Sequence, residues 1–341
     1  NFVRGGEVLF SGNDPWYHYR QIVYVVHHWP QVMPFDPWTY FPYGTSVGQF
    51  GTLFDQAIAT AALMVGLGAP SEHTVAMTVL FAPPVIGALV LLPTYVIGRR
   101  LGGRIAGVAS AVTLALLPGL FLVRSLVGAT DHNIAEPLFQ ATAVLALLVA
   151  IGAAERDRPV WDQVADRDFS GLRAPLGWSL LAGVMTALYM WVWPPGVLLV
   201  GIVGVYFVLK LAGDYVNDIS PDHLGIVAVV SMTTTGLLML YALNDLGFSP
   251  TKFSLLQPLL AFGVAAGAGV MMALARVWND RDLDRSLYPV AVGGLIVAAA
   301  LIVWLVLPDL FALTQNNVFR VIGFGTQART RTIGEAQPWL A

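Results

Sequence analysis

The stretch VIGALVLLPTYVIGRRLGGRIAGVASAVTLALLPGLFLV, residues 85–123, contains two apolar runs separated by a short basic turn. An α-helix needs about 20 predominantly apolar residues to cross the hydrocarbon core of a bilayer. The runs therefore predict two membrane-spanning helices, at about 75–97 and 104–123. The basic residues of the turn are Arg99, Arg100 and Arg104. Because arginine and lysine concentrate in cytoplasmic loops, the turn is predicted to face the cytoplasm.

The composition of the whole chain is that of a membrane protein. Of its 341 residues, 56% are hydrophobic and only 11% are charged, whereas a soluble domain carries about 25% charged residues. The chain has no cysteine, which excludes disulfides, thiolate zinc sites and a thiol nucleophile. The net charge is −3, and we expect no nucleic-acid partner. The chain begins at Asn1 without a methionine or a signal-like segment, and Ala341 follows a polar stretch. We therefore expect a chain truncated at both ends.

Apolar segments recur along the chain and predict eight spans in all. The remaining six lie at about 135–153, 176–193, 195–211, 224–243, 256–275 and 288–307. A ninth apolar stretch, 52–68, is short and contains Asp55 and Gln56, so we assign it to a helix in the membrane interface. With that assignment the three arginine-bearing loops, at 99–104, 156–173 and 276–285, all fall on the cytoplasmic side. The expected fold is an all-α polytopic membrane protein.

This topology divides the chain into three parts. Residues 1–74 are predicted to form a first external loop that includes the interfacial helix. Residues 75–307 form the transmembrane helical domain, with a second external loop at 124–134. Residues 308–341 begin a further external loop. Three polar segments are therefore expected to share the external side.

Each of these polar segments carries ionisable residues. The first, SGNDPWYHYR at residues 11–20, places Asp14 before a proline and several aromatics, which is also typical of a capped turn at the membrane interface. The second, RSLVGATDHN at residues 124–133, ends in Asp131, His132 and Asn133. Helix capping is an alternative role for Asp131 or Asn133.

The third segment, RTRTIGE at residues 329–335, is by itself typical of a solvated tail. Taken together, the three segments indicate a metal site that none of them indicates alone. Proteins hold hard divalent cations with oxygen ligands from separate loops, and the predicted topology gathers acidic loops on one face of the membrane.

In their order along the chain these motifs resemble those of a known family. The motifs are DPWYHYR at 14–20, FPYG at 41–44, VGATDHN at 127–133 and TIGE at 332–335. They resemble the catalytic subunits of oligosaccharyltransferases, above all the archaeal AglB family of the GT-C glycosyltransferase superfamily. The resemblance covers essentially the whole chain. It implies a GT-C type transmembrane helical domain in the cell membrane, with an active site on the extracellular side between the first and fifth external loops.

The resemblance also implies an activity. It is the inverting transfer of an oligosaccharide from a dolichol-phosphate-type lipid carrier to the Asn side chain of an Asn-X-Ser/Thr sequon, dependent on Mg²⁺ or Mn²⁺. Catalytic roles are implied for Asp14 and Glu335, and metal-binding roles for Asp14, Asp131 and Asn133. An amide at position 133 departs from the Asp, Glu or His usual there. Substrate-binding roles are implied for Arg124, His132, Thr332 and Ile333; the alternative for Arg124 is to anchor the end of a span. The family's soluble sequon-reading domain is expected to be missing.

Three other functions remain open at the level of sequence. A protein O-mannosyltransferase also uses early-loop acids and a lipid-linked sugar, although the TIGE motif argues against it. A secondary transporter places its functional charges at the bilayer midplane in broken helices, whereas the predicted spans are nearly free of ionisable residues. In a non-catalytic scaffold the external acids need not converge.

Overall fold

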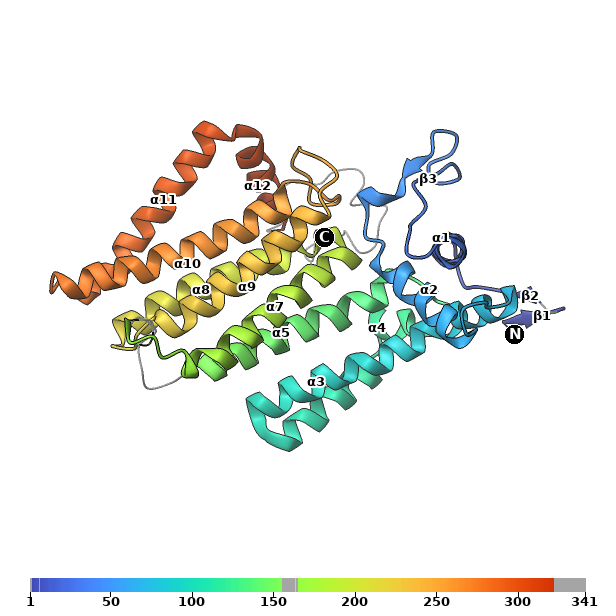
Figure 1. Cartoon of the computed structure of the whole chain (residues 1–341), viewed down its shortest axis with the longest axis horizontal. Helices are drawn as coiled ribbons and strands as arrows, with labels where there is room; N and C mark the ends of the chain where they lie inside the picture. The colour runs from blue at the N-terminus through green and yellow to red at the C-terminus, as the bar shows by residue number, and fades with distance from the viewer. Residues whose placement is uncertain (1, 6, 155–162, 164, 322–341) are drawn as a thin grey trace. The chain divides into compact units, whose positions relative to one another are not determined.

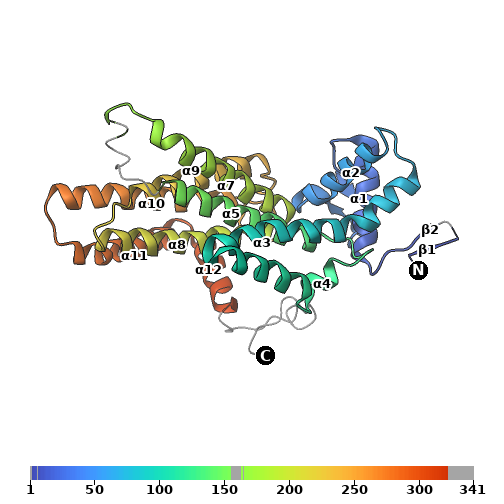
Figure 2. The same ribbon diagram turned by 90° about the horizontal axis from the view of Figure 1, so that it is seen from below.

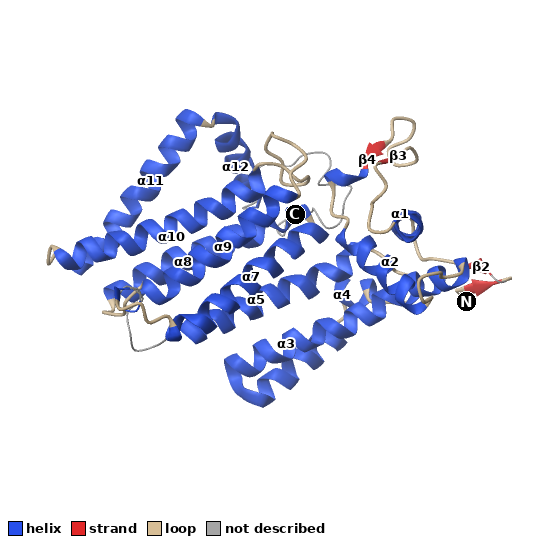
Figure 3. Cartoon of the chain, viewed as in Figure 1, coloured by secondary structure: helices blue, strands red, loops and turns tan. Residues whose placement is uncertain are grey.

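The computed structural model describes residues 2–5, 7–154, 163 and 165–321, which are mostly helical (Figures 1 and 3). The chain divides into two compact units, one of Asn1–Leu211 with Ser220–Ala273 and the other of Ala212–Ile219 with Leu274–Ala341. Among the described residues, seven helices are long and apolar enough to cross a membrane.

The helices that begin in the first unit are α1 (Asp14–His28), α2 (Leu53–Val65), α3 (Glu72–Leu116), α4 (Leu120–Arg124), α5 (Ala135–Ala154), α7 (Arg173–Val192), α8 (Val197–Val216), α9 (Asp222–Tyr241) and α10 (Leu256–Asp280). Those of the second unit are α11 (Tyr288–Val306) and α12 (Pro308–Val321). Single 3-10 turns are η1 (Val47–Gln49), η2 (His132–Ile134), η3 (Ser170–Leu172), η4 (Pro194–Gly196) and η5 (Arg285–Leu287).

Helix α3 contains the first two predicted spans, folded back on each other (Figures 1 and 2). Its 45 residues are interrupted at Gly102 and at Gly103, whose φ of +79° is in the region that favours glycine. The two limbs approach closely at glycines, since a Cβ on Gly98 would lie 2.5 Å from Ser110 Oγ. The seven long helices therefore include the first predicted span and the first part of the second within one helix, α3.

The second predicted span, 104–123, is not one continuous helix. Helix α3 ends at Leu116, and α4 begins only at Leu120. Pro118 causes this break, because proline has no amide hydrogen and disfavours helical geometry in the residue before it. Leu117 is accordingly extended, with ψ of 118°.

The part of the chain before α3 is held together by an apolar core shared by three helices. Helix α1 contributes Ile22 and Val25, α2 contributes Phe54 and Ile58, and α3 contributes Val79, all of them buried. Helix α2 has 13 residues, fewer than the roughly 20 that a crossing needs. Its place in the membrane interface stays a prediction.

Two small antiparallel hairpins, which the sequence did not predict, flank α1. Strands β1 (Val3–Arg4) and β2 (Glu7–Val8) pair with Val3 opposite Val8. Strands β3 (Phe35–Asp36) and β4 (Thr45–Ser46) pair with Phe35 opposite Ser46.

Helices α5, α7 and α9 lie side by side and pack through small residues (Figures 1 and 2). A Cβ on Gly183 of α7 would lie 2.4 Å from the carbonyl oxygen of Ser231 in α9. The Thr235 hydroxyl donates a hydrogen bond to the Gly183 carbonyl at 3.1 Å. Small residues let membrane helices approach closely, and these helices agree with the predicted spans 135–153, 176–193 and 224–243.

In the second unit, side-chain contacts join residues 212–219 to residues 279–288. The Tyr215 hydroxyl donates a hydrogen bond to Asn279 Oδ1 at 2.7 Å, and the rings of Tyr215 and Tyr288 lie 4.3 Å apart. Asp218 forms an ion pair with Arg285. Helix α12 starts at Pro308, so the loop predicted from residue 308 begins as a helix.

Candidate active site

The turn that carries Asp131 is fastened to α3 by hydrogen bonds. The Thr130 hydroxyl donates to the Val79 carbonyl at 2.7 Å, and the Gly128 amide donates to the Leu80 carbonyl at 2.9 Å. The segment before α1 joins the same turn, because the Ser11 amide donates to the Gly128 carbonyl at 3.0 Å. These contacts bring the first and second predicted polar segments together.

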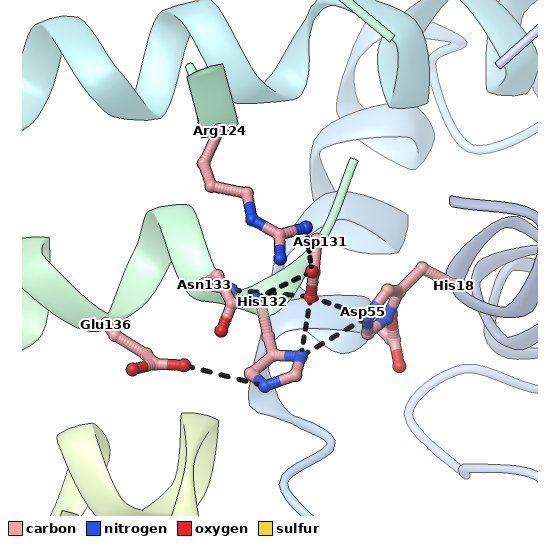
Figure 4. Close-up of polar contacts among 7 residues, drawn as sticks. All are labelled: His18, Asp55, Arg124, Asp131, His132, Asn133 and Glu136. Atoms are coloured by element: carbon pink, nitrogen blue, oxygen red, sulfur yellow. Dashed lines mark hydrogen bonds and ion pairs between the residues drawn. The ribbon is translucent and has the colours of Figure 1, made fainter. Parts of the chain in front are cut away.

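Asp131 is only 2% exposed and is surrounded by nitrogen atoms (Figure 4). Arg124 Nη1 and Asn133 Nδ2 each donate to its Oδ2 at 2.8 Å. Its Oδ1 lies 2.8 Å from His132 Nδ1 and 3.5 Å from His18 Nε2. The backbone amide of Asn133 lies 3.5 Å from the same Oδ1. Asp131 therefore also caps η2, the alternative role left open by the sequence.

A second buried carboxylate lies behind His18. Asp55 Oδ1 is 2.7 Å from His18 Nδ1, and the two side chains are 3% and 5% exposed. On the other side of the site, His132 Nε2 lies 3.5 Å from Glu136 Oε1. Carboxylates and imidazoles therefore alternate along a chain of residues, shown in Figure 4 as Asp55, His18, Asp131, His132 and Glu136.

This alternation determines the charges at the site. Burial opposes ionisation of Asp131, but hydrogen bonds from His132 and His18 outweigh it and hold the pKa of Asp131 well below its usual range. Burial likewise opposes charge on His18. The facing carboxylates of Asp55 and Asp131 nevertheless raise the pKa of His18 to about 10. Asp131 is thus an ionised carboxylate that faces the guanidinium of Arg124 and the imidazole of His18.

Asp14 lies at the first turn of α1 and is exposed. It lines an open cavity of about 230 Å³ together with Arg124 and Asp131. Apolar residues such as Phe2 and Val127 also line the cavity. Asp14 and Asp131, two of the acids predicted to share the external side, therefore line one cavity together with Arg124.

The structure brings most of the predicted site residues together. Asp14, Arg124 and Asp131 line the cavity, and His132 and Asn133 contact Asp131. Asn133 presents its amide nitrogen to Asp131 (Figure 4). The remaining predicted residues, Thr332, Ile333 and Glu335, lie outside the described residues. The roles assigned to all of these residues stay predictions.

His18 and Asp55 were not predicted as site residues. A signal for His18 was present, since it shares a helical face with Ile22 and Val25 at spacings of four and seven residues, and all three are buried. Asp55 served in the sequence only to argue that 52–68 does not cross the membrane. An ionisable side chain inside an apolar helix is in itself an indication of function.

The donor atoms of the site fit a divalent cation. One ligand atom from each of His18, Asp131 and His132 lies within 4.8 Å of the others. Mg²⁺ prefers oxygen ligands, whereas imidazole nitrogen is typical of transition metals. The donor set therefore favours a transition metal over Mg²⁺.

Comparison with known sequences gives consistent matches. A family model described as "Oligosaccharyl transferase STT3, N-terminal" matches residues 3–319. The dolichyl-monophosphooligosaccharide–protein glycotransferase AglB of Haloferax volcanii is 56% identical over 340 residues, which are 100% of this chain and 32% of that protein. Dolichyl-phosphooligosaccharide-protein glycotransferase 3 of Archaeoglobus fulgidus is 32% identical over 352 residues, 100% of this chain and 38% of that protein. The chain thus spans about a third of the length of these curated relatives.

Solved structures of the A. fulgidus oligosaccharyltransferase AglB share the fold. Its complex with an inhibitory peptide and a dolichol-phosphate has a TM-score of 0.80 at 29% identity, covering 94% of this chain and 36% of that one. Its complex with Zn and sulfate has a TM-score of 0.73 at 30% identity, covering 89% and 37%. A form tethered to an acceptor peptide with an NVT sequon has a TM-score of 0.72 at 30% identity, covering 89% and 35%.

Proposed function

The chain belongs to the STT3 oligosaccharyl transferase family, and we propose that it forms the membrane-embedded catalytic part of an enzyme for protein N-glycosylation. That enzyme transfers an oligosaccharide from a dolichol-phosphate-type carrier to the Asn side chain of an Asn-X-Ser/Thr sequon. The observation that carries the proposal is the shared cavity of Asp14, Arg124 and Asp131. The family match favours this activity over protein O-mannosylation.

We assign the divalent cation to the carboxylates that face the cavity. Asp131 and Asp14 are its predicted oxygen ligands, and the nitrogens of His18 and His132 lie close to Asp131. We propose Mn²⁺ over Mg²⁺ because Mg²⁺ is held by oxygen ligands and water, which leaves no place for these nitrogens. Asn133 belongs to the predicted ligand set, although its amide nitrogen donates to Asp131 here. When bound, the cation supplies stabilisation of negative charge on the phosphate leaving group.

The acceptor is the carboxamide of asparagine, which is a poor nucleophile because its nitrogen lone pair is delocalised. Asp14 and Glu335 are proposed to accept hydrogen bonds from the two N–H bonds of this carboxamide. Such bonds polarise the amide and free the lone pair for attack on the anomeric carbon, with inversion. Thr332 and Ile333 are proposed to hold the acceptor peptide in an external loop that begins at residue 308.

Arg124 is proposed to serve the donor. One of its nitrogens binds Asp131, and a guanidinium has further N–H groups arranged to suit a phosphate. His132, which is about one-third exposed and contacts Asp131, is proposed to bind the donor as well. The lipid-linked glycan is therefore proposed to bind beside Arg124 and His132, next to the buried carboxylate of Asp131.

The test is glycan transfer to a labelled Asn-X-Thr peptide by membranes that carry the full-length protein, with and without Mn²⁺. Asp14→Ala, Asp131→Ala and Glu335→Ala are expected to lower the rate at least about a hundredfold. Asp245→Ala is the control, since Asp245 is an exposed acid predicted to lie on the external side but outside the cavity. Transfer that survives all three changes would contradict the site. Absence of transfer to asparagine under every condition would contradict the function.

A further inference from the structure

Asp55 is a buried acid in a mainly apolar helix. Helix α2 reads LFDQAIATAALMV, and Asp55 is only 2% exposed. A buried carboxylate is costly unless a cation or hydrogen-bond donor pairs with it. Its partner is His18 Nδ1, at 2.7 Å. A leucine would fill such a position in a helix that only packs, so the carboxylate needs an explanation beyond packing.

His18 has both ring nitrogens engaged, on opposite sides of the ring. Nδ1 faces Asp55, whereas Nε2 lies 3.5 Å from Asp131 Oδ1 and 3.4 Å from His132 Nδ1. The ring also packs edge-on against Phe54, with centroids 5.0 Å apart and planes at 78°. Helix α2 thus supplies both the hydrogen-bond partner and the wall that fix this imidazole.

Asp36 shows what a purely structural buried carboxylate looks like in the same part of the chain. It is fully buried, and it accepts hydrogen bonds from Arg20, Gln21 and Thr39. None of these three residues lines the cavity of Asp14 and Asp131. Asp55 differs because its partner reaches Asp131 through its second nitrogen.

We propose that Asp55 is a positioning residue that fixes the His18 ring with Nε2 toward Asp131, and that His18 thereby becomes a nitrogen ligand of the divalent cation. The inference rests on the proposed function, because it requires a cation at this site. Glu136 stands in a similar relation to His132, at 3.5 Å from its Nε2, so each imidazole has a carboxylate on the side away from Asp131.

The chemistry of such a pair is well defined. A histidine that donates its Nδ1–H to a carboxylate presents Nε2 to a metal, and the bound cation displaces the proton from Nε2 because a ligating imidazole is neutral. Loss of the carboxylate typically weakens metal binding about 10–100-fold. An asparagine in place of Asp55 can donate its own N–H to Nδ1. The ring proton then moves to Nε2, where it points at the cation site.

The experiment measures Mn²⁺ binding to purified full-length protein from the loss of the free-ion electron paramagnetic resonance signal. Asp55→Asn and His18→Gln are each expected to raise the Kd for Mn²⁺ about tenfold or more. Asp36→Asn, which removes an equally buried carboxylate, is expected to leave the Kd within about twofold. In the double variant Asp55→Asn/His18→Gln, the effects are expected not to add, since Asp55 acts through His18.

Several outcomes overturn the inference. An unchanged Kd in Asp55→Asn refutes it, and so does an unchanged Kd in His18→Gln, which decides the matter if Asp55→Asn fails to fold. Additive effects in the double variant refute the route through His18. Mn²⁺-dependent glycan transfer by the wild type alongside any of these results leaves the proposed function standing. A wild type that neither binds Mn²⁺ nor transfers glycan overturns both.

Discussion

Arg124 Nη1 lies 2.8 Å from Asp131 Oδ2, so the guanidinium at the end of α4 neutralises a carboxylate that is almost fully buried. Sequence alone left two roles for Arg124, a partner for the lipid phosphate or an anchor for the end of a span. The structure adds a third, the counter-ion of Asp131. The third role is compatible with the first, because a guanidinium carries five N–H groups.

Removal of this guanidinium is expected to impair transfer. A hydrogen bond to a charged group contributes about 1.5–3 kcal/mol, so Arg124→Ala is expected to lower kcat/KM for peptide glycosylation about tenfold or more. Arg124→Lys is expected to retain part of the activity, since lysine keeps the charge but lacks the planar fork. Arg104→Ala, in the basic turn of α3, is the control. Wild-type kcat/KM in Arg124→Ala would contradict the role.

The stability of the first external segment is expected to depend on pH through Asp36. Burial opposes its ionisation, but hydrogen bonds from Arg20, Thr39 and the Trp38 amide outweigh burial and lower the pKa of Asp36. A lowered folded-state pKa adds stability at pH values above the unfolded-state pKa of about 3.9. This contribution is lost as the pH falls through the folded-state pKa.

Thermal unfolding of the wild type and Asp36→Asn across pH 7 to 3 measures this contribution. The difference in melting temperature is expected to be constant near neutral pH and to shrink below about pH 4. A difference that grows as the pH falls would contradict the assigned sign.

The contact between α7 and α9 is expected to tolerate no side chain at Gly183. A Cβ there would lie 2.4 Å from the Ser231 carbonyl oxygen, so Gly183→Ala is expected to cost about 1–3 kcal/mol by overpacking. Gly177→Ala is the matched control in the same helix, because nothing lies within 4 Å of its Cβ position. Thermal unfolding in detergent measures both. Equal melting temperatures for the two variants would show that the helices do not pack as described.

The predicted topology can be checked by cysteine labelling, because the chain has no cysteine of its own. Leu101→Cys, in the turn of α3, is expected to react only with a thiol reagent that reaches the cytoplasm. Trp38→Cys, in the first external loop, is expected to react with an impermeant reagent added outside intact cells. Both positions are well exposed, at 76% and 68%. Labelling of both from the same side would place the two loops on one face of the membrane and contradict the predicted topology.

The membrane helices were largely predictable because the signal for them is local. The prediction of 135–153 corresponds to α5 (Ala135–Ala154), and that of 176–193 to α7 (Arg173–Val192). Apolar length and flanking arginines suffice for such segments. The break after Leu116 was missed, because the span predicted at 104–123 runs across Pro118, where the helix ends.

The site was predictable only in part, because its assembly depends on contacts between distant segments. In the structure Asp14 and Asp131 line one cavity, and the predicted topology is compatible with this. The pairing of His18 with Asp55 depends on how α1 packs against α2, and sequence spacing does not state that packing. The face that His18 shares with Ile22 was the available clue. Glu335 lies outside the described residues, so its role remains a prediction.

The separation of the site residues along the chain has a consequence for biosynthesis. His18 and Asp55 are 37 residues apart, whereas His18 and His132 are 114 apart. Chains fold from the N-terminus as they leave the ribosome, so the imidazole and its carboxylate can meet before the α3 hairpin has been inserted. Asp131 joins them only after that hairpin is complete. A nascent chain can therefore form the pair of His18 and Asp55 early, and it gains Asp131, the proposed ligand of the cation, only after the α3 hairpin has formed.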